Sequence, residues 1–186
     1  MEQMNTSFKI IFWIAFLLAF NNNIIPQTLK QSDSRPEPTM VGLSNDYIYV
    51  DISCNDFMFI LGDVDKFISL IDQFSANTIS RLRTAGIKVS DDDLLGKLKY
   101  PNFYVNISLL AIGNNQVTYG YAYSVRFGLW QKVILSRDRN IEEYGTTWAR
   151  SEIGYASKEN LIAQLHNVIK EKTNEFIIEY LKANSK

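Results

Sequence analysis

Few side chains in this sequence have the types and spacing that catalysis requires, and the single histidine is the first of them. His166 could act as a general base or a metal ligand, but no acidic or cysteine partner lies at ligand spacing from it. One histidine cannot supply a multi-histidine zinc site. No G-x-S-x-G motif is present to position the serine of a Ser-His-Asp triad. The sequence therefore predicts no catalytic role for His166.

Carboxylates are the second group of side chains that could take part in metal binding or acid–base catalysis. The three aspartates at 91–93 are consecutive, whereas calcium loops place their ligands at alternate positions around a glycine turn. We expect these aspartates to form a solvated turn that caps a short helix beginning near Leu94, and not a metal site. Asp51, Asp56 or Glu152 could meet in the fold as an acid–base pair, although their spacing does not indicate it.

Cys54 is the only cysteine, so the chain cannot form an intramolecular disulfide. Because it follows a strand-like run, we expect a small buried hydrophobe and not a reactive thiol. The sequence contains no phosphate-binding loop and no dinucleotide fingerprint. We therefore predict no catalytic residue, no metal site and no cofactor.

The charge of the chain is nearly balanced, with 19 Lys and Arg residues against 20 Asp and Glu residues. Nucleic-acid binding through phosphates normally needs a clear basic excess or a basic stripe. The clusters around Arg81 and Arg137 are short, and acidic residues interrupt the second one. We therefore expect no nucleic-acid partner.

The first elements expected in the folded part are a strand and a long helix. Alternation across residues 47–52 has the period of a strand, and it places the start of the domain near Asn45. Residues 64–85 carry one apolar helical face, and Gly86 follows where a helix commonly ends. The stripe consists of Phe67, Ile71, Phe74, Thr78, Leu82 and Ala85.

Adjacent strands and a closing helix follow. Residues 103–112 and 117–129 predict two strands joined by a Gly-Asn-Asn-Gln hairpin turn. A third strand is expected at 131–135 and a fourth at 146–153. The last helix is expected at 158–183, with Ser157 at its N-cap. Its apolar stripe consists of Ile162, Leu165, Ile169, Thr173, Phe176 and Tyr180.

This order predicts an α+β fold. It comprises an antiparallel sheet of about four strands with two long helices packed on one face, in the order β-α-β-β-β-(β)-α. The two helices provide the apolar faces that a domain without disulfides needs for its core.

The hairpin predicts two faces of different character. With Asn114-Asn115 as the turn, the odd-numbered residues of 103–111 share one face with Gly120, Ala122 and Ser124, which should be the core beneath the helices. Leu110 and Ile112 are expected on the opposite face, with Tyr104. The other face would then be half polar and rich in tyrosine, whose ring is apolar and whose tip is polar. Its predicted partner-binding residues are Tyr104, Asn106, Tyr119, Tyr121 and Tyr123. Ordinary cross-strand stabilisation of an open sheet is the alternative interpretation of these aromatic side chains.

The N-terminal region indicates export. Residues 10–20 read IIFWIAFLLAF, an uninterrupted apolar run with one basic residue before it. A membrane-spanning helix needs about 20 apolar residues, so this run has the length of a signal-peptide core. We expect a signal peptide at 1–28, a flexible linker with two prolines at 29–44, and one domain at 45–186. No stable membrane span is expected once the signal is removed.

The C-terminal region contains a recognisable pattern of residues. Residues 148–154 read WARSEIG, and the helix that follows ends with FIIEYLKAN at 176–184. In these residues the chain resembles the C-terminal part of small exported bacterial proteins of unknown function. In those proteins a tryptophan and a glycine precede a helix that ends in a Phe…Tyr-Leu…Asn pattern. The resemblance implies a small periplasmic or secreted domain similar to auxiliary envelope proteins, and it implies no catalytic residue.

The sequence as a whole favours a non-enzymatic binding domain in the periplasm or outside the cell. Its tyrosine-rich sheet face would contact a protein, an envelope component or a second copy of the chain. A small hydrolase that uses carboxylates in a cleft and a structural envelope subunit are the two alternative functions.

Overall fold

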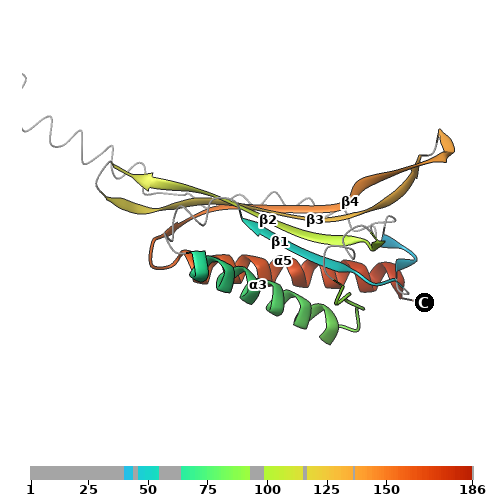
Figure 1. Cartoon of the computed structure of the whole chain (residues 1–186), viewed down its shortest axis with the longest axis horizontal. Coiled ribbons are helices and arrows are strands. Elements are labelled where there is room, and N and C mark those ends of the chain that lie inside the picture. Colours follow the sequence, from blue (N-terminus) through green and yellow to red (C-terminus); the bar gives the residue numbers. More distant parts are fainter. Residues whose placement is uncertain are drawn as a thin grey trace, which may run out of the picture. The chain divides into compact units, whose positions relative to one another are not determined.

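The structure is a computed structural model that describes residues 40–43, 46–54, 64–92, 99–114, 117–135 and 137–185 (Figure 1). Four strands and two helices make up this described part, which confirms the expected α+β class. In chain order they are β1 (Tyr49–Cys54), α3 (Val64–Thr84), β2 (Asn102–Gly113), β3 (Thr118–Leu135), β4 (Asp138–Ser157) and α5 (Leu161–Asn184). The predicted signal peptide, Asp56 and Asp93 lie outside the described residues.

The four strands form one sheet in the order β1-β2-β3-β4. β2, β3 and β4 are antiparallel neighbours, but β1 pairs with β2 in parallel. The expectation of an antiparallel sheet is therefore wrong for the first strand. Hairpin turns join antiparallel neighbours, whereas a connection that includes α3 returns the chain to begin β2 beside the start of β1.

Strands β3 and β4 are longer than the sequence pattern predicts. The strands expected at 117–129 and 131–135 are one continuous strand, β3. β4 begins at Asp138 instead of 146 because Asp138 and residues 142–145 pair with β3 through the backbone, while the side chains of this segment are largely exposed. An exposed ribbon needs no alternation of apolar and polar residues, and the sequence pattern therefore gives no signal for it.

The register between β2 and β3 differs from the expected one. The strands close where the Asn114 amide donates to the Val117 carbonyl at 2.9 Å, and Gly113 pairs with Thr118. The next pair is Ile112 with Gly120, so Tyr119 is an extra residue on β3. This β-bulge moves every later residue of β3 to the face opposite to the predicted one.

The bulge decides which side chains enter the core. The aliphatic residues of β2 are buried as predicted, but the odd-numbered residues of β3 join them. The placement of Gly120, Ala122 and Ser124 in the core is therefore wrong. The buried residues of this face are Phe103, Val105, Ile107 and Leu109 from β2, with Tyr121, Tyr123, Val125, Phe127 and Leu129 from β3.

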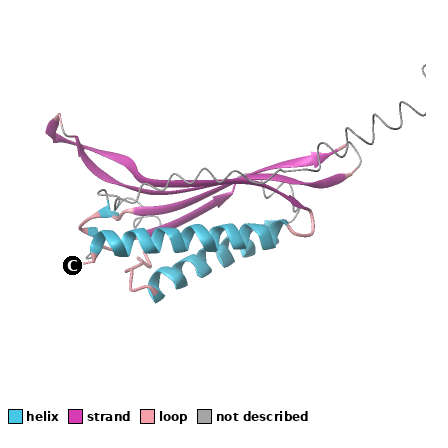
Figure 2. Cartoon of the chain, turned by 180° about the vertical axis from the view of Figure 1, so that it is seen from behind, coloured by secondary structure: helices cyan, strands magenta, loops and turns pink. Residues whose placement is uncertain are grey.

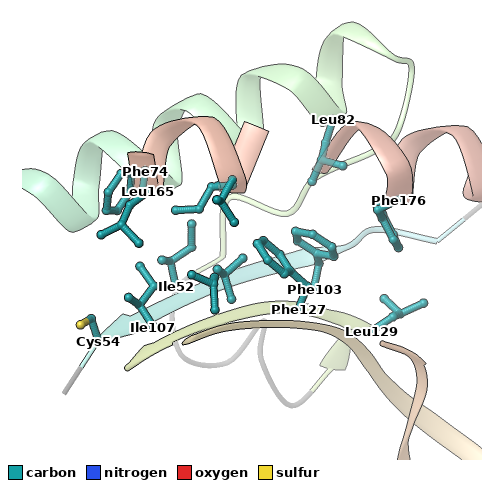
Figure 3. Close-up of a cluster of buried hydrophobic side chains, with 14 of the residues drawn as sticks. Ile52, Cys54, Phe74, Leu82, Phe103, Ile107, Phe127, Leu129, Leu165 and Phe176 are labelled. Atoms are coloured by element: carbon teal, nitrogen blue, oxygen red, sulfur yellow. The ribbon is translucent and has the colours of Figure 1, made fainter. Parts of the chain in front are cut away.

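Both helices lie on the same side of the sheet (Figures 1 and 2). α5 reaches the sheet through Phe176, whose ring centroid is 4.5 Å from that of Phe103. α3 reaches α5 through Phe74, whose ring meets His166 edge-on at 4.5 Å. Figure 3 shows side chains from the two helices pointing toward those of β1, β2 and β3 in one apolar cluster, with Cys54 at its edge.

The end of α3 agrees with the prediction from the sequence, whereas the start of α5 differs from it. Gly86 follows α3 with a φ of +81°, as expected for a residue that ends a helix. α5 begins at Leu161 with Asn160 at its N-cap, so the assignment of Ser157 as N-cap is wrong. Ser157 is instead the last residue of β4. Within the described residues, no helix has the length and apolar composition needed to cross a membrane.

The packed part of the chain begins before Asn45. Met40 and Leu43 are buried in the core, within the range expected to be linker. The Tyr180 hydroxyl donates to the Leu43 carbonyl at 2.7 Å. The Asn184 side chain donates to the Met40 carbonyl at 2.9 Å and accepts from the Gly42 amide at 3.0 Å. The last turn of α5 therefore holds residues 40–43 in place.

Tyr123 and Gly154 form a close pair between β3 and β4 on the helix-covered face. They are direct partners in the register, and a Cβ built on Gly154 would overlap the Tyr123 ring. Gly154 therefore leaves the space that allows a large aromatic side chain to lie flat between the sheet and α5.

We predict that Gly154→Ala lowers the free energy of unfolding by about 1–3 kcal/mol, because the Tyr123 ring must leave its packed position. Denaturant unfolding followed by circular dichroism measures this change. Gly145→Ala, in the same strand, is the matched control because a Cβ there meets nothing nearer than Val133 at 3.5 Å. Equal effects at the two glycines would show that the Tyr123 ring can move at little cost.

Candidate functional site

The five predicted binding residues do not share one face. Tyr121 and Tyr123 are each only 4% exposed and lie beneath the helices. Tyr104 and Asn106 lie on the opposite face of the sheet and are half-buried. Tyr119, at the bulge, is 58% exposed. The expected single tyrosine-rich surface is therefore wrong, because the bulge separates the β3 tyrosines from the β2 residues.

Tyr123 connects the sheet to α5 and is not available to a partner. Its hydroxyl accepts a hydrogen bond from Gln164 Nε2 at 3.2 Å, and its ring covers Gly154. A buried tyrosine normally finds a partner for its hydroxyl in this way. The residue therefore contributes to folding.

Tyr104 and Asn106 stabilise the face that the helices leave uncovered, which we call the open face. The Tyr104 ring lies over Gly128, its direct partner on β3. The Asn106 side chain donates to the Ser53 hydroxyl on β1 at 3.1 Å. These contacts connect three neighbouring strands and leave the two side chains partly accessible.

Large apolar side chains are exposed elsewhere on the open face. Pairing places Leu110, Ala122 and Tyr155 in one row across β2, β3 and β4, with Ile153 in the adjoining row. We define the open-face patch as Leu110, Ile112, Ile153 and Tyr155, whose exposed fractions range from 42% to 78%.

Only part of this patch was predictable from the hairpin. The expected pairing puts Leu110 and Ile112 on the same face as Tyr104, as the structure does. Ile153 and Tyr155, which lie in β4, were not among the predicted binding residues. The sequence did contain a signal for this pair: Ile153 and Tyr155 are two positions apart, and side chains at i and i+2 of a strand lie on one face.

Asp51 and Glu152, the two candidate acid–base carboxylates among the described residues, are not brought together. Asp51 pairs with Tyr104 in the register and lies on the open face of β1. Glu152 lies on the helix-covered face of β4, where its carboxylate is 3.7 Å from the Lys172 ammonium. Asp91 forms an ion pair with Arg83 at the surface. Across the described ranges, no three His, Cys, Asp or Glu side chains are grouped so that they could hold a metal ion.

A wide hollow of about 450 Å³ runs along α3 and carries two carboxylates, Asp65 and Asp72. Both residues are exposed to solvent. A general acid usually requires burial or a close charge that raises the pKa of its carboxyl group. This hollow therefore does not resemble a cleft with two buried acids.

A polar network holds β4 against α5. The Glu179 carboxylate accepts from the Trp148 indole at 2.7 Å and from the Arg150 guanidinium at 2.6 Å. About two helical turns before Glu179 in α5, the Lys172 ammonium donates to the Glu175 carboxylate at 2.8 Å. Burial lowers the pKa of the Lys172 ammonium, but the hydrogen bond to Glu175 and the charges of Glu175, Glu152 and Glu171 outweigh it and raise this pKa overall.

We predict that Glu179→Ala lowers the free energy of unfolding by about 1–3 kcal/mol, because the buried Trp148 indole loses its acceptor. The measurement is urea unfolding followed by tryptophan fluorescence. Glu171→Ala removes an exposed carboxylate from the same helix and should change stability by less than about 0.5 kcal/mol. Equal losses in the two variants would show that the Trp148 hydrogen bond adds nothing.

The pKa of His166 predicts a pH dependence of stability. Burial lowers this pKa below its usual value of 6.5, so the folded state binds its proton less readily than the unfolded state. Stability should be constant above the unfolded pKa and should fall as the pH drops below about 6.5. His166→Gln should lose less stability than the original chain between pH 7 and pH 5 in parallel urea titrations. Identical losses would exclude His166 as their source.

The comparisons with known proteins identify no family for this chain. No family model matches the chain, and a search of curated proteins finds no match. Among solved structures, the chain is similar to a rare lipoprotein B from Shewanella oneidensis, with a TM-score of 0.27 and 12% sequence identity. The alignment covers 73% of this chain and 92% of that one.

Proposed function

We propose that this chain is an exported domain that binds a protein partner through the open-face patch. The patch supports this function because apolar side chains from β2 and β4 are exposed side by side on a face that neither α3 nor α5 covers. A contiguous exposed apolar surface on a folded domain commonly marks an interaction site.

The surroundings of the patch suit a protein surface. Ser108, Ser124 and Arg126 adjoin Leu110 and Ile153 on the same face. A protein interface typically has an apolar centre with aromatic residues and a polar, solvent-accessible rim. Tyr155 and the aliphatic residues provide the centre, and the serines and Arg126 provide the rim.

Residues 10–20 support export. Their uninterrupted apolar run has the length of a signal-peptide core. We infer that the domain works in the periplasm or outside the cell, with a single buried cysteine and no internal disulfide to maintain. The alternative of a carboxylate-based hydrolase has less support, because Asp51 and Glu152 lie on opposite faces of the sheet.

We predict that Leu110→Ser combined with Ile153→Ser weakens partner association at least about tenfold, because a buried apolar centre dominates binding energy. Photo-crosslinkers placed at Tyr155 in the exported protein should capture one discrete partner, and the double variant should lose that product. Ile178→Ser is the matched control, since Ile178 is 65% exposed but lies on α5.

Equal cross-linking in the double variant and the original chain would contradict the proposal. Unfolding measurements check that the double variant remains folded, and stability should change by less than about 0.5 kcal/mol because both side chains are exposed. A cross-link to a second copy of the chain, matched by a dimer in sedimentation equilibrium, would identify a homodimer as the occupant.

A further inference from the structure

A second surface lies where α3 and α5 run side by side. A groove of about 160 Å³ is formed by the two helices, which run in the same direction (Figure 1). Among the described residues that line it are two cationic side chains and no carboxylate. The lining residues are Phe74, Asn77, Thr78 and Arg81 from α3, with His166, Asn167, Ile169 and Lys170 from α5.

Thr78, which lines the groove, carries a buried hydroxyl with no hydrogen-bond partner among the described residues. Thr78 is only 1% exposed, and its Oγ1 forms no hydrogen bond with any described residue. A buried hydroxyl without a partner is costly, so such groups are normally satisfied by protein, water or ligand. In an α-helix, a threonine usually bonds the carbonyl one turn earlier, which Thr78 does not do.

The cationic groups keep donors available at the same place. Arg81 makes one long hydrogen bond, from Nη1 to Asn174 Oδ1 at 3.5 Å, and a guanidinium has five N–H donors. Lys170 is exposed on the facing helix. Guanidinium and ammonium groups bind phosphate oxygens through strong, charge-assisted hydrogen bonds.

We propose that this groove binds a phosphate-like oxyanion between the Arg81 guanidinium, the Lys170 ammonium and the Thr78 hydroxyl. His166 lies at one end of the groove against Phe74. Its imidazole can add an N–H donor without adding charge. The anion is either free phosphate or the phosphate group of a small ester, since both present the same oxygens.

The single histidine gives a direct probe. Because the sequence contains one histidine, its imidazole Hε1 proton gives a single, unambiguous signal in a proton NMR spectrum of the full chain. Titration with sodium phosphate should shift this signal saturably, with a dissociation constant of about 1 mM or tighter. Arg81→Gln and Lys170→Gln should each weaken binding about tenfold, because each loses a charge-assisted hydrogen bond. Arg139→Gln, which removes one positive charge from the exposed start of β4, should bind as the original chain does.

A further variant separates binding from folding. Thr78→Val keeps the shape of the side chain and removes its unpartnered hydroxyl, so it should raise the unfolding midpoint and weaken phosphate binding severalfold. Glycerol 3-phosphate titrated in parallel shows the source of the anion: tighter binding of the ester indicates a phosphate ester, and tighter binding of inorganic phosphate indicates the free ion.

Three results would overturn the proposal. The first is a His166 signal that moves without saturation, and the second is an equal shift with sodium chloride at matched ionic strength. The third is unchanged affinity in a folded Arg81→Gln, Lys170→Gln double variant.

Discussion

The register between β2 and β3 is the constraint on which both faces of the sheet depend. Side chains alternate between the two faces of a strand. A single extra residue in β3 therefore turns the residues that would face the helices toward the solvent, and the others toward the helices. Tyr119 is that extra residue. Because of it, Val125, Phe127 and Leu129 complete the core, and Ala122 and Ser124 lie on the open face between the exposed side chains of β2 and β4.

The two layers of the domain are joined by unlike contacts. Beneath β2 and β3 the contact with α5 is aromatic, through Phe103 and Phe176. Beneath β4 the Trp148 ring also meets Phe176, at 5.1 Å between centroids, and Glu179 adds polar contacts by accepting from Trp148 and Arg150. Arg150 and Glu152 of β4 each face an oppositely charged side chain of α5, Glu179 and Lys172, and these pairs favour this placement of β4 along α5. The last turn of α5 also holds residues 40–43, so one helix organises both the edge of the sheet and the start of the packed chain.

This arrangement leaves two surfaces of different chemistry. The open-face patch is apolar with a polar rim and suits contact with a protein. The groove between α3 and α5 is small, cationic and contains the Thr78 hydroxyl, and it suits an anion. They belong to different layers, and no residue contributes to both. Binding at one surface can therefore be tested without altering the residues of the other.

The sequence by itself determined the elements whose signal is local. The apolar stripes at 64–85 and 158–183 predicted α3 and α5 to within a few residues at each end, because helical packing repeats within one segment. Alternation likewise predicted β2, most of β3 and the burial of Cys54. These patterns need no information from distant parts of the chain.

Tertiary structure decided everything that depends on pairing between segments. The parallel placement of β1 and the exposed start of β4 rest on backbone hydrogen bonds, which leave no pattern in the side chains. The bulge at Tyr119 buried Tyr121 and Tyr123, which the even-length turn alone would have left beside Tyr104. It was also pairing across the sheet that gathered Leu110, Ile153 and Tyr155, and helix packing that gathered Arg81, Thr78 and Lys170. Local periodicity shows which residues share a face of one element, but only long-range register shows what that face meets.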